Sequence, residues 1–131
     1  MIEKVIHNER VLSIIIRNSF KKTGITFFTP DDFSQQLAYM NHPKGKMIQP
    51  HRHNSLPREV FYTQEVLFLK KGRLRVDFYS DDNEYLESRE LDAGDVILLA
   101  SGGHGFEALE EIEMIEVKQG PYAGDEDKVR F

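Results

Sequence analysis

Two histidines one residue apart, His51 and His53, have the spacing that most directly suggests chemistry in this sequence. They lie in the stretch GKMIQPHRHN, after a glycine and a proline. In an extended strand, residues two positions apart project from the same face, so the two imidazoles would reach one point. Because imidazole is a common metal ligand, the pair predicts a two-ligand clip for a metal ion. The alternative is a pair of solvent-exposed or hydrogen-bonded histidines in a loop.

A glutamate and a third histidine could complete such a site. Glu65 opens EVLFLKKG and shares strand parity with Leu67 and Leu69, so its carboxylate faces an interior if those leucines do. A carboxylate buried without a partner costs several kcal/mol and therefore needs a cation or hydrogen-bond donors. His104 lies in GGHGF, where the neighbouring glycines let the backbone turn tightly. The alternatives are an edge carboxylate that faces water and a turn histidine.

The absence of cysteine limits the chemistry further. With no thiolate in the 131 residues, any metal must be held by imidazole and carboxylate groups. Such ligands suit a divalent ion of Fe, Mn, Ni, Zn or Cu and do not distinguish among these metals. The formal net charge of −5 offers no basic field for a phosphate backbone, so no nucleic-acid partner is expected. No separate acid–base pair, nucleophile motif or phosphate loop assigns a catalytic residue, which leaves the catalytic residues unknown.

The elements that position these side chains are expected to be short strands. Short apolar runs recur between clusters of Gly, Pro, Asn and Asp, and no stretch keeps helical periodicity. Leu74, Val76 and Phe78 alternate with polar residues, which predicts one buried and one solvent-facing side. The candidate strands are 10–17, 25–28, 35–41, 46–53, 65–70, 73–80, 84–90, 95–100, 104–109 and 112–118. Together they predict an all-β chain with a closed or sandwiched antiparallel sheet.

The whole chain, residues 1–131, is expected to form a single domain, because its length suits one core. The apolar run near its start is short and lacks a small-residue cleavage site, so it reads as a strand. A cytoplasmic location and no membrane partner are therefore expected. The last segment, EVKQGPYAGDEDKVRF, carries Tyr122, Val129 and Phe131 as apolar anchors. It is expected to pack onto the body or onto a second subunit.

Two motifs, in this order, resemble those of the cupins, a family of small β-barrels. The first cupin motif runs glycine, five residues, His-x-His, a gap, glutamate, six residues and glycine. Its elements fall on Gly45, His51, His53, Glu65 and Gly72. The gap between the second histidine and the glutamate is eleven residues here, where the family usually has three or four.

The second cupin motif runs glycine, five residues, proline, one residue, glycine, two residues and histidine. The stretch GDVILLASGGHGF is similar to it in outline, through Gly94, Gly102 and His104. Ala100 stands at the usual proline, and one residue fewer separates Gly102 from the histidine. The resemblance covers about residues 37–117, the motif-bearing part of the expected barrel.

The resemblance implies an antiparallel cupin-type β-barrel, a double-stranded β-helix or jelly roll. The family's metal ligands fall on His51, His53, Glu65 and His104. Glu59 lies nearer the usual distance from His53 and is the alternative carboxylate, but the six-residue spacing to Gly72 favours Glu65. Many cupins pair through an edge strand, so the resemblance also implies a homodimer.

The family includes dioxygenases, decarboxylases and sugar isomerases or epimerases, and also plain binding and sensing domains. The expected function is therefore a metal-dependent enzyme, dioxygenase- or isomerase-like, that acts on a small oxygen-rich molecule in the barrel mouth. The alternative is a small-ligand binding or sensing module without turnover. Further contributors to the mouth are expected among Arg52, Tyr62, Gln64 and Phe106.

Overall fold

The computed structural model describes all residues from 1 to 131 and consists almost entirely of strands and their connections. The strands are β1 (Ile2–His7), β2 (Arg10–Ile16), β3 (Gly24–Phe27), β4 (Ala38–Asn41), β5 (Glu65–Lys71), β6 (Arg73–Tyr79), β7 (Tyr85–Asp92), β8 (Val96–Leu99), β9 (Gly103–Ala108) and β10 (Glu113–Lys118). One short 3-10 helix, η1 (Gly124–Asp127), follows β10. None of the chain is folded into a helix that has the length and apolar character needed to cross a bilayer. The predicted all-β class is confirmed.

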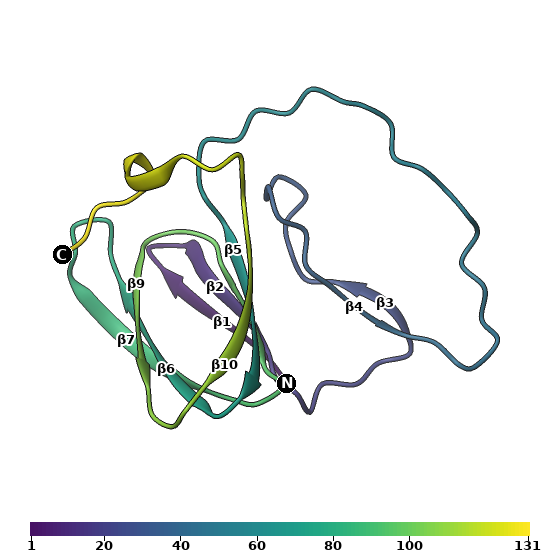
Figure 1. Ribbon diagram of the computed structural model, residues 1–131, viewed down its shortest axis with the longest axis horizontal. Helices are drawn as coiled ribbons and strands as arrows, with labels where there is room; N and C mark the ends of the chain where they lie inside the picture. The colour runs from purple at the N-terminus through teal and green to yellow at the C-terminus, as the bar shows by residue number, and fades with distance from the viewer.

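Two antiparallel sheets form the body of the molecule (Figure 1). One has five strands in the order β1-β2-β8-β5-β10, and the other has three in the order β7-β6-β9. The buried apolar cluster draws on both sheets, with Leu67 and Leu69 from β5 and Leu74 and Val76 from β6. The core therefore lies between the sheets.

The β5–β6 hairpin shows how local sequence sets this packing. Leu74, Val76 and Phe78 are buried along β6, as their alternation predicts, while the intervening polar side chains are partly exposed. The turn at Gly72 has a left-handed φ of 85°, and a Cβ there would lie 2.2 Å from the Glu111 carbonyl oxygen. Only glycine meets both demands.

The connection between β4 and β5 differs from the prediction. Residues 42–64, here called the arm, form neither strand nor helix. Figure 1 shows the arm as a wide excursion that leaves β4 and returns to β5 from well outside the two sheets. The strand predicted at 46–53 is wrong, because this stretch has no partner strand. Pro50 and Pro57 favour the same outcome, since neither can donate a ladder hydrogen bond.

Strands β3 and β4 pair only with each other and stand apart from both sheets. An isolated two-stranded hairpin is marginally stable, so its position depends on other contacts. Before β4, the Ser34 hydroxyl and the Gln35 backbone N–H donate hydrogen bonds to the side-chain oxygen of Gln64 (3.3 and 3.0 Å). After β2, the ring of Phe20 packs edge-on against Tyr39 at a centroid distance of 4.9 Å. These contacts attach the hairpin to the start of β5 and the end of β2.

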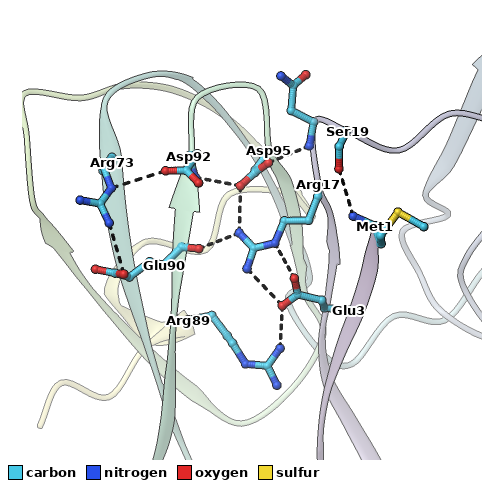
Figure 2. Close-up of polar contacts among 10 residues, drawn as sticks. Met1, Glu3, Arg17, Ser19, Arg73, Arg89, Glu90, Asp92 and Asp95 are labelled. Carbon is cyan, nitrogen blue, oxygen red and sulfur yellow. Dashed lines mark hydrogen bonds and ion pairs between the residues drawn. The ribbon is translucent and has the colours of Figure 1, made fainter.

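An ion-pair network closes one end of the two-sheet body (Figure 2). Asp95, 3% exposed, directly precedes β8 and accepts hydrogen bonds from the backbone N–H groups of Asn18 (2.7 Å) and Asp92 (2.8 Å). Arg17 donates to Asp95 (2.9 Å) and also to Glu3 (2.6 Å). Strand β8 then runs from this closed end to the opposite end of the body, where a cavity opens.

Candidate functional site

A cavity of about 990 Å³ lies at the end of the sheets opposite the Asp95 network. Its walls come from the start of β5, the end of β6, the segment from β8 into β9, the end of β10 and the C-terminal segment. In Figure 1 the C-terminal segment, in yellow, crosses the upper ends of these strands. Two of the predicted metal ligands, Glu65 and His104, line this cavity.

Strand register places Glu65 on the cavity floor. As the first residue of β5, it pairs with Leu99 of β8 on one side and with Lys118 of β10 on the other. It shares the inward parity of buried Leu67 and is itself 9% exposed. The inward orientation predicted from strand parity is confirmed.

Two basic groups flank the Glu65 carboxylate. The Nε2 atom of His104 lies 3.4 Å from Oε2, and the Nζ atom of Lys118 lies 3.3 Å from Oε1. His104 foremost, together with Lys118, holds the pKa of the Glu65 carboxyl below its usual range, although burial opposes this shift. Glu65 in turn raises the pKa of the Lys118 ammonium. At neutral pH the cavity floor therefore carries a carboxylate with an ammonium beside it.

The glycine-rich stretch before His104 brings this side chain to the cavity. Gly102 has a φ of 73°, and a Cβ there would lie 2.8 Å from the Tyr79 carbonyl oxygen. His104 then pairs with Phe78 across the β6–β9 ladder, and its ring lies 5.3 Å from that of Phe106. The close passage past β6 thus depends on a residue without a side chain at position 102.

The other two predicted ligands lie elsewhere, on the exposed arm. The rings of His51 and His53 are 5.4 Å apart, edge to face, and neither lines the cavity. The Nδ1 atom of His51 lies 2.9 Å from the backbone oxygen of Gln49, within its own loop. Glu59, the alternative carboxylate, is also exposed on the arm.

The predicted metal ligands therefore form two pairs, Glu65 with His104 and His51 with His53. Nowhere do three or more His, Asp or Glu side chains converge as a group that could hold a metal ion. A metal site built from protein groups usually has three or four ligands, so the residues as arranged fit a metal only in part. The four-ligand site stays a prediction that requires the arm to reach the cavity.

The remaining residues predicted at the mouth have different positions. Tyr62 and Phe106 line the cavity. Gln64 is buried beside it and accepts the hydrogen bonds that hold the β3–β4 hairpin. Arg52 is exposed on the arm between the two histidines.

Lys118 is the functional candidate that the sequence analysis missed. Its partner is set by the register of β5 against β10, which joins residues 53 positions apart in the chain. The only local signal is that Lys118 shares strand parity with the partly buried Met114. A lysine on the inward side of a strand implies a carboxylate partner, but not which one.

The C-terminal segment supplies another wall of the cavity. The Phe131 ring packs edge-on against Tyr79 at 5.1 Å and lies directly over Gly103. The hydroxyl of Thr63 donates a hydrogen bond to Asp127, which ties η1 to the end of the arm. The predicted packing of this segment onto the body is confirmed for Phe131. Tyr122 and Val129 are over 80% exposed in the single chain, so for these two residues only packing onto a second subunit stays a prediction.

Comparison with known proteins identifies no relative of this chain. No family model matches the chain, and neither a curated protein nor a solved structure matches it.

Proposed function

We propose that this chain binds a small, oxygen-rich molecule in the cavity between its two sheets. The observation that carries this proposal is the buried Glu65 carboxylate, which faces the cavity between His104 and Lys118. The cavity volume of about 990 Å³ is at the upper end of the range for small-molecule sites. Polar groups that converge in such a cavity fix the orientation of a ligand.

One unpaired cation on the lining, Lys128, supports an anionic group on the ligand. The lining carries four cationic side chains, Arg10, Lys118, Lys128 and Arg130, and four acidic ones, Glu65, Asp81, Glu116 and Asp127. Arg10 is paired with Asp81 (2.5 Å), whereas Lys128 takes part in none of the ion pairs of the molecule. An ammonium without a carboxylate partner at a cavity mouth favours a ligand that brings its own negative charge.

The proposal includes a cupin-type barrel as the finer description of the two-sheet fold. Its support is the backbone at the glycines of the two motifs, all of which have left-handed φ values. These values are 88° at Gly45, 85° at Gly72, 93° at Gly94 and 73° at Gly102. Turns at the motif glycines are what the resemblance implies, because residues with a Cβ rarely adopt this conformation.

The first form of the function is a metal-dependent enzyme, dioxygenase- or isomerase-like. A divalent ion of Fe, Mn, Ni, Zn or Cu would supply Lewis-acid or oxygen chemistry when bound. Glu65 and His104 would hold it from the cavity, and His51 and His53 would have to join them from the arm. The arm would carry them there, and its residues 43–62 are exposed throughout.

The second form is a binding or sensing module without turnover. It is favoured by Lys118, whose ammonium compensates the Glu65 charge from within the chain. A cavity whose carboxylate already has a cationic partner needs no metal to be stable.

A ligand panel tests the cavity. Thermal unfolding should be measured with small carboxylic, hydroxy and sugar acids, for the wild type and for Glu65→Gln and His104→Ala. We expect at least one compound to raise the melting temperature of the wild type and to lose most of this effect in both variants. Lys70→Met, an exposed lysine outside the cavity, is the control and should respond like the wild type. If no compound stabilises the wild type, or if the variants respond equally, the proposed site is wrong.

Elemental analysis and turnover assays separate the two forms. An enzyme of the first form should purify with metal, lose it in His51→Ala and in His104→Ala, and keep it in His7→Ala. It should also convert a stabilising compound in air or without oxygen. Saturable binding without product under both conditions would identify the module.

A further inference from the structure

The outer face of the five-stranded sheet is apolar and becomes uncovered toward its β10 edge. Ile14, Leu98, Val66 and Val117 form one row of directly paired residues across β2, β8, β5 and β10. Ile14 and Leu98 are fully buried although they lie outside the core cluster between the sheets. Val66 is partly exposed, and Val117 at the end of the row is 55% exposed. The cover over this face therefore stops before β10.

The open part of this face is a small apolar surface, here called the β10 patch, made of Phe68, Ile115 and Val117. Phe68 pairs with Ile115 across the β5–β10 ladder, and the two are 37% and 52% exposed. Glu116 and Lys118 alternate with the patch residues of β10 and line the cavity. Because successive residues of a strand point to opposite sides, the patch faces away from the cavity.

The arm, residues 42–64, exposes apolar and cationic side chains of its own. Its large apolar side chains are all more than 40% exposed, and they are Met47, Ile48, Leu56, Val60, Phe61 and Tyr62. Its cations take part in none of the ion pairs of the chain, and they are Lys44, Lys46, Arg52 and Arg58. An ordered segment loses conformational entropy, which only contacts can offset. The arm therefore favours a partner that is both apolar and acidic.

The rest of the same chain has this character. The arm contains four basic residues and one acidic residue, a formal charge of +3, whereas the other residues comprise 13 basic and 21 acidic ones, a formal charge of −8. Glu113, exposed on β10 beside the patch, has no ion-pair partner within the chain. Complementary charges of this kind steer association and fix its orientation.

We propose that the arm docks on the β10 patch of a second copy of this chain, where its apolar side chains cover Phe68, Ile115 and Val117. The arm returns to β5, the neighbour of β10, so it ends beside the patch of its own chain (Figure 1). Two copies that face each other through this side can therefore exchange arms about a twofold axis, as an isologous interface requires. An arm held on a second copy keeps His51 and His53 away from Glu65, which agrees with the binding module.

Cross-linking between introduced cysteines tests the contact, since the chain has no cysteine of its own. An untagged Leu56→Cys chain, changed on the arm, is mixed with a tagged Ile115→Cys chain and treated with a short bis-maleimide reagent. We expect the mixed product to form about tenfold faster than with Ile6→Cys, because docking raises the effective concentration of the two thiols. Ile6 is the matched control, being 54% exposed on the opposite edge strand β1. Equal rates in the two mixtures would overturn the inference.

The dissociation constant of the dimer, measured by analytical ultracentrifugation, tests the arm itself. The double variant Met47→Asp, Leu56→Asp should raise it about tenfold or more, because unpaired carboxylates oppose burial in an interface. Lys46→Glu should raise it several-fold, whereas Lys4→Glu makes the same change of charge on β1 and should leave it unaltered.

Two outcomes of this measurement would overturn the inference. One is a wild-type chain that stays at 15.2 kDa at every concentration, which would leave the arm to a different acidic partner. The other is a dimer that survives the double variant but not Val117→Asp, which would show that the edge strands pair without the arm. Should an arm variant fail to fold, the cross-linking rates decide alone. None of these results changes the ligand panel, because the patch and the cavity lie on opposite sides of β10.

Discussion

Asp95 is the residue whose loss should cost this fold the most among its charged groups. Its buried carboxylate joins the start of β8 to the chain after β2 and to the end of β7, through three donors. Asp95→Ala removes this carboxylate. The Arg17 guanidinium then lacks one of its ion-pair partners, and the two backbone N–H groups lack their hydrogen-bond acceptor. We expect a loss of about 3–5 kcal/mol in the free energy of unfolding, measured by urea denaturation.

The control for this change is Asp82→Ala, since Asp82 is exposed in the β6–β7 turn and takes part in no ion pair. It should alter stability by less than about 0.5 kcal/mol. Equal effects of the two substitutions would show that the Asp95 network contributes nothing specific.

Glu3 should make stability depend on acid pH. Arg17, with a smaller contribution from Arg89, holds the pKa of the Glu3 carboxyl below its usual range against the opposing effect of burial. A carboxyl that ionises more readily in the folded chain adds stability above its unfolded pKa, about 4.3, and this stability is lost as pH falls through the lower folded value. The urea concentration at the midpoint of unfolding should therefore decrease once the pH is lowered below about 4.

Glu3→Gln should be less stable than the wild type at pH 7 and should lose less on acidification. Glu59→Gln, on the exposed arm, should follow the wild type at every pH. Parallel curves for Glu3→Gln and the wild type would exclude Glu3 as a source of the acid sensitivity.

At the scale of elements, the strands that the sequence predicts well are those whose burial pattern is local. Leu74, Val76 and Phe78 alternate within one strand, so β6 needs no knowledge of its neighbours. The stretch 46–53 differs from β6, because it could form a strand only by pairing with the edge strand of a sheet, and such pairing is not visible in its own sequence. β1 escaped prediction because its apolar positions, such as Val5, are separated by charged residues. A register shift after Val5 also interrupts its pairing with β2.

The C-terminal segment is an element held by few contacts, and Phe131 is the contact that can be tested. Phe131→Ala removes the edge-on packing against Tyr79 and the cover over Gly103. An aromatic pair of this kind contributes about 1 kcal/mol, so the melting temperature should fall by a few degrees. Tyr122→Ala, at a side chain that is 93% exposed, should leave it unchanged. A drop of equal size in both variants would contradict the anchoring role of Phe131.

At the scale of the whole molecule, the open sheet edges bear on the predicted homodimer. Strands β1, β10, β7 and β9 each end a sheet, and an unpaired edge favours association. On β10, Ile115 and Val117 are more than half exposed. Light scattering at micromolar concentration should give about 30 kDa, twice the 15.2 kDa of one chain.

A charged residue on the outer side of β10 should break such a dimer if this edge forms it. Val117→Asp should then give a mass near that of one chain, whereas Ile6→Asp, on the opposite edge strand β1, should leave the dimer intact. A wild-type mass near 15.2 kDa would contradict the dimer itself.

The sequence could predict the class of the fold and the inward direction of Glu65, since both follow from patterns within single strands. It could not predict which side chain meets Glu65, because the partner Lys118 depends on how β10 aligns with β5. Nor could spacing decide where His51 and His53 lie, since eleven intervening residues allow the chain to return to β5 by many routes. Local order is thus readable from the sequence, and non-local pairing is not.

The arm has one more consequence, which concerns the continuity of the chain. Four strands precede it and six follow, yet the last four residues of β2, from the first part, pair with β8 from the second. The core cluster likewise combines Val5, Leu12 and Ile15 with residues that follow the arm. The contacts that join the two parts are therefore non-covalent ones of the ladder and the core, and they lie outside 42–64. Two fragments made by cutting the chain within the arm should reassemble through the β2–β8 ladder. The fold is therefore a candidate for split-protein complementation, in which each fragment is fused to one of two proteins and reassembly reports that these proteins bind each other.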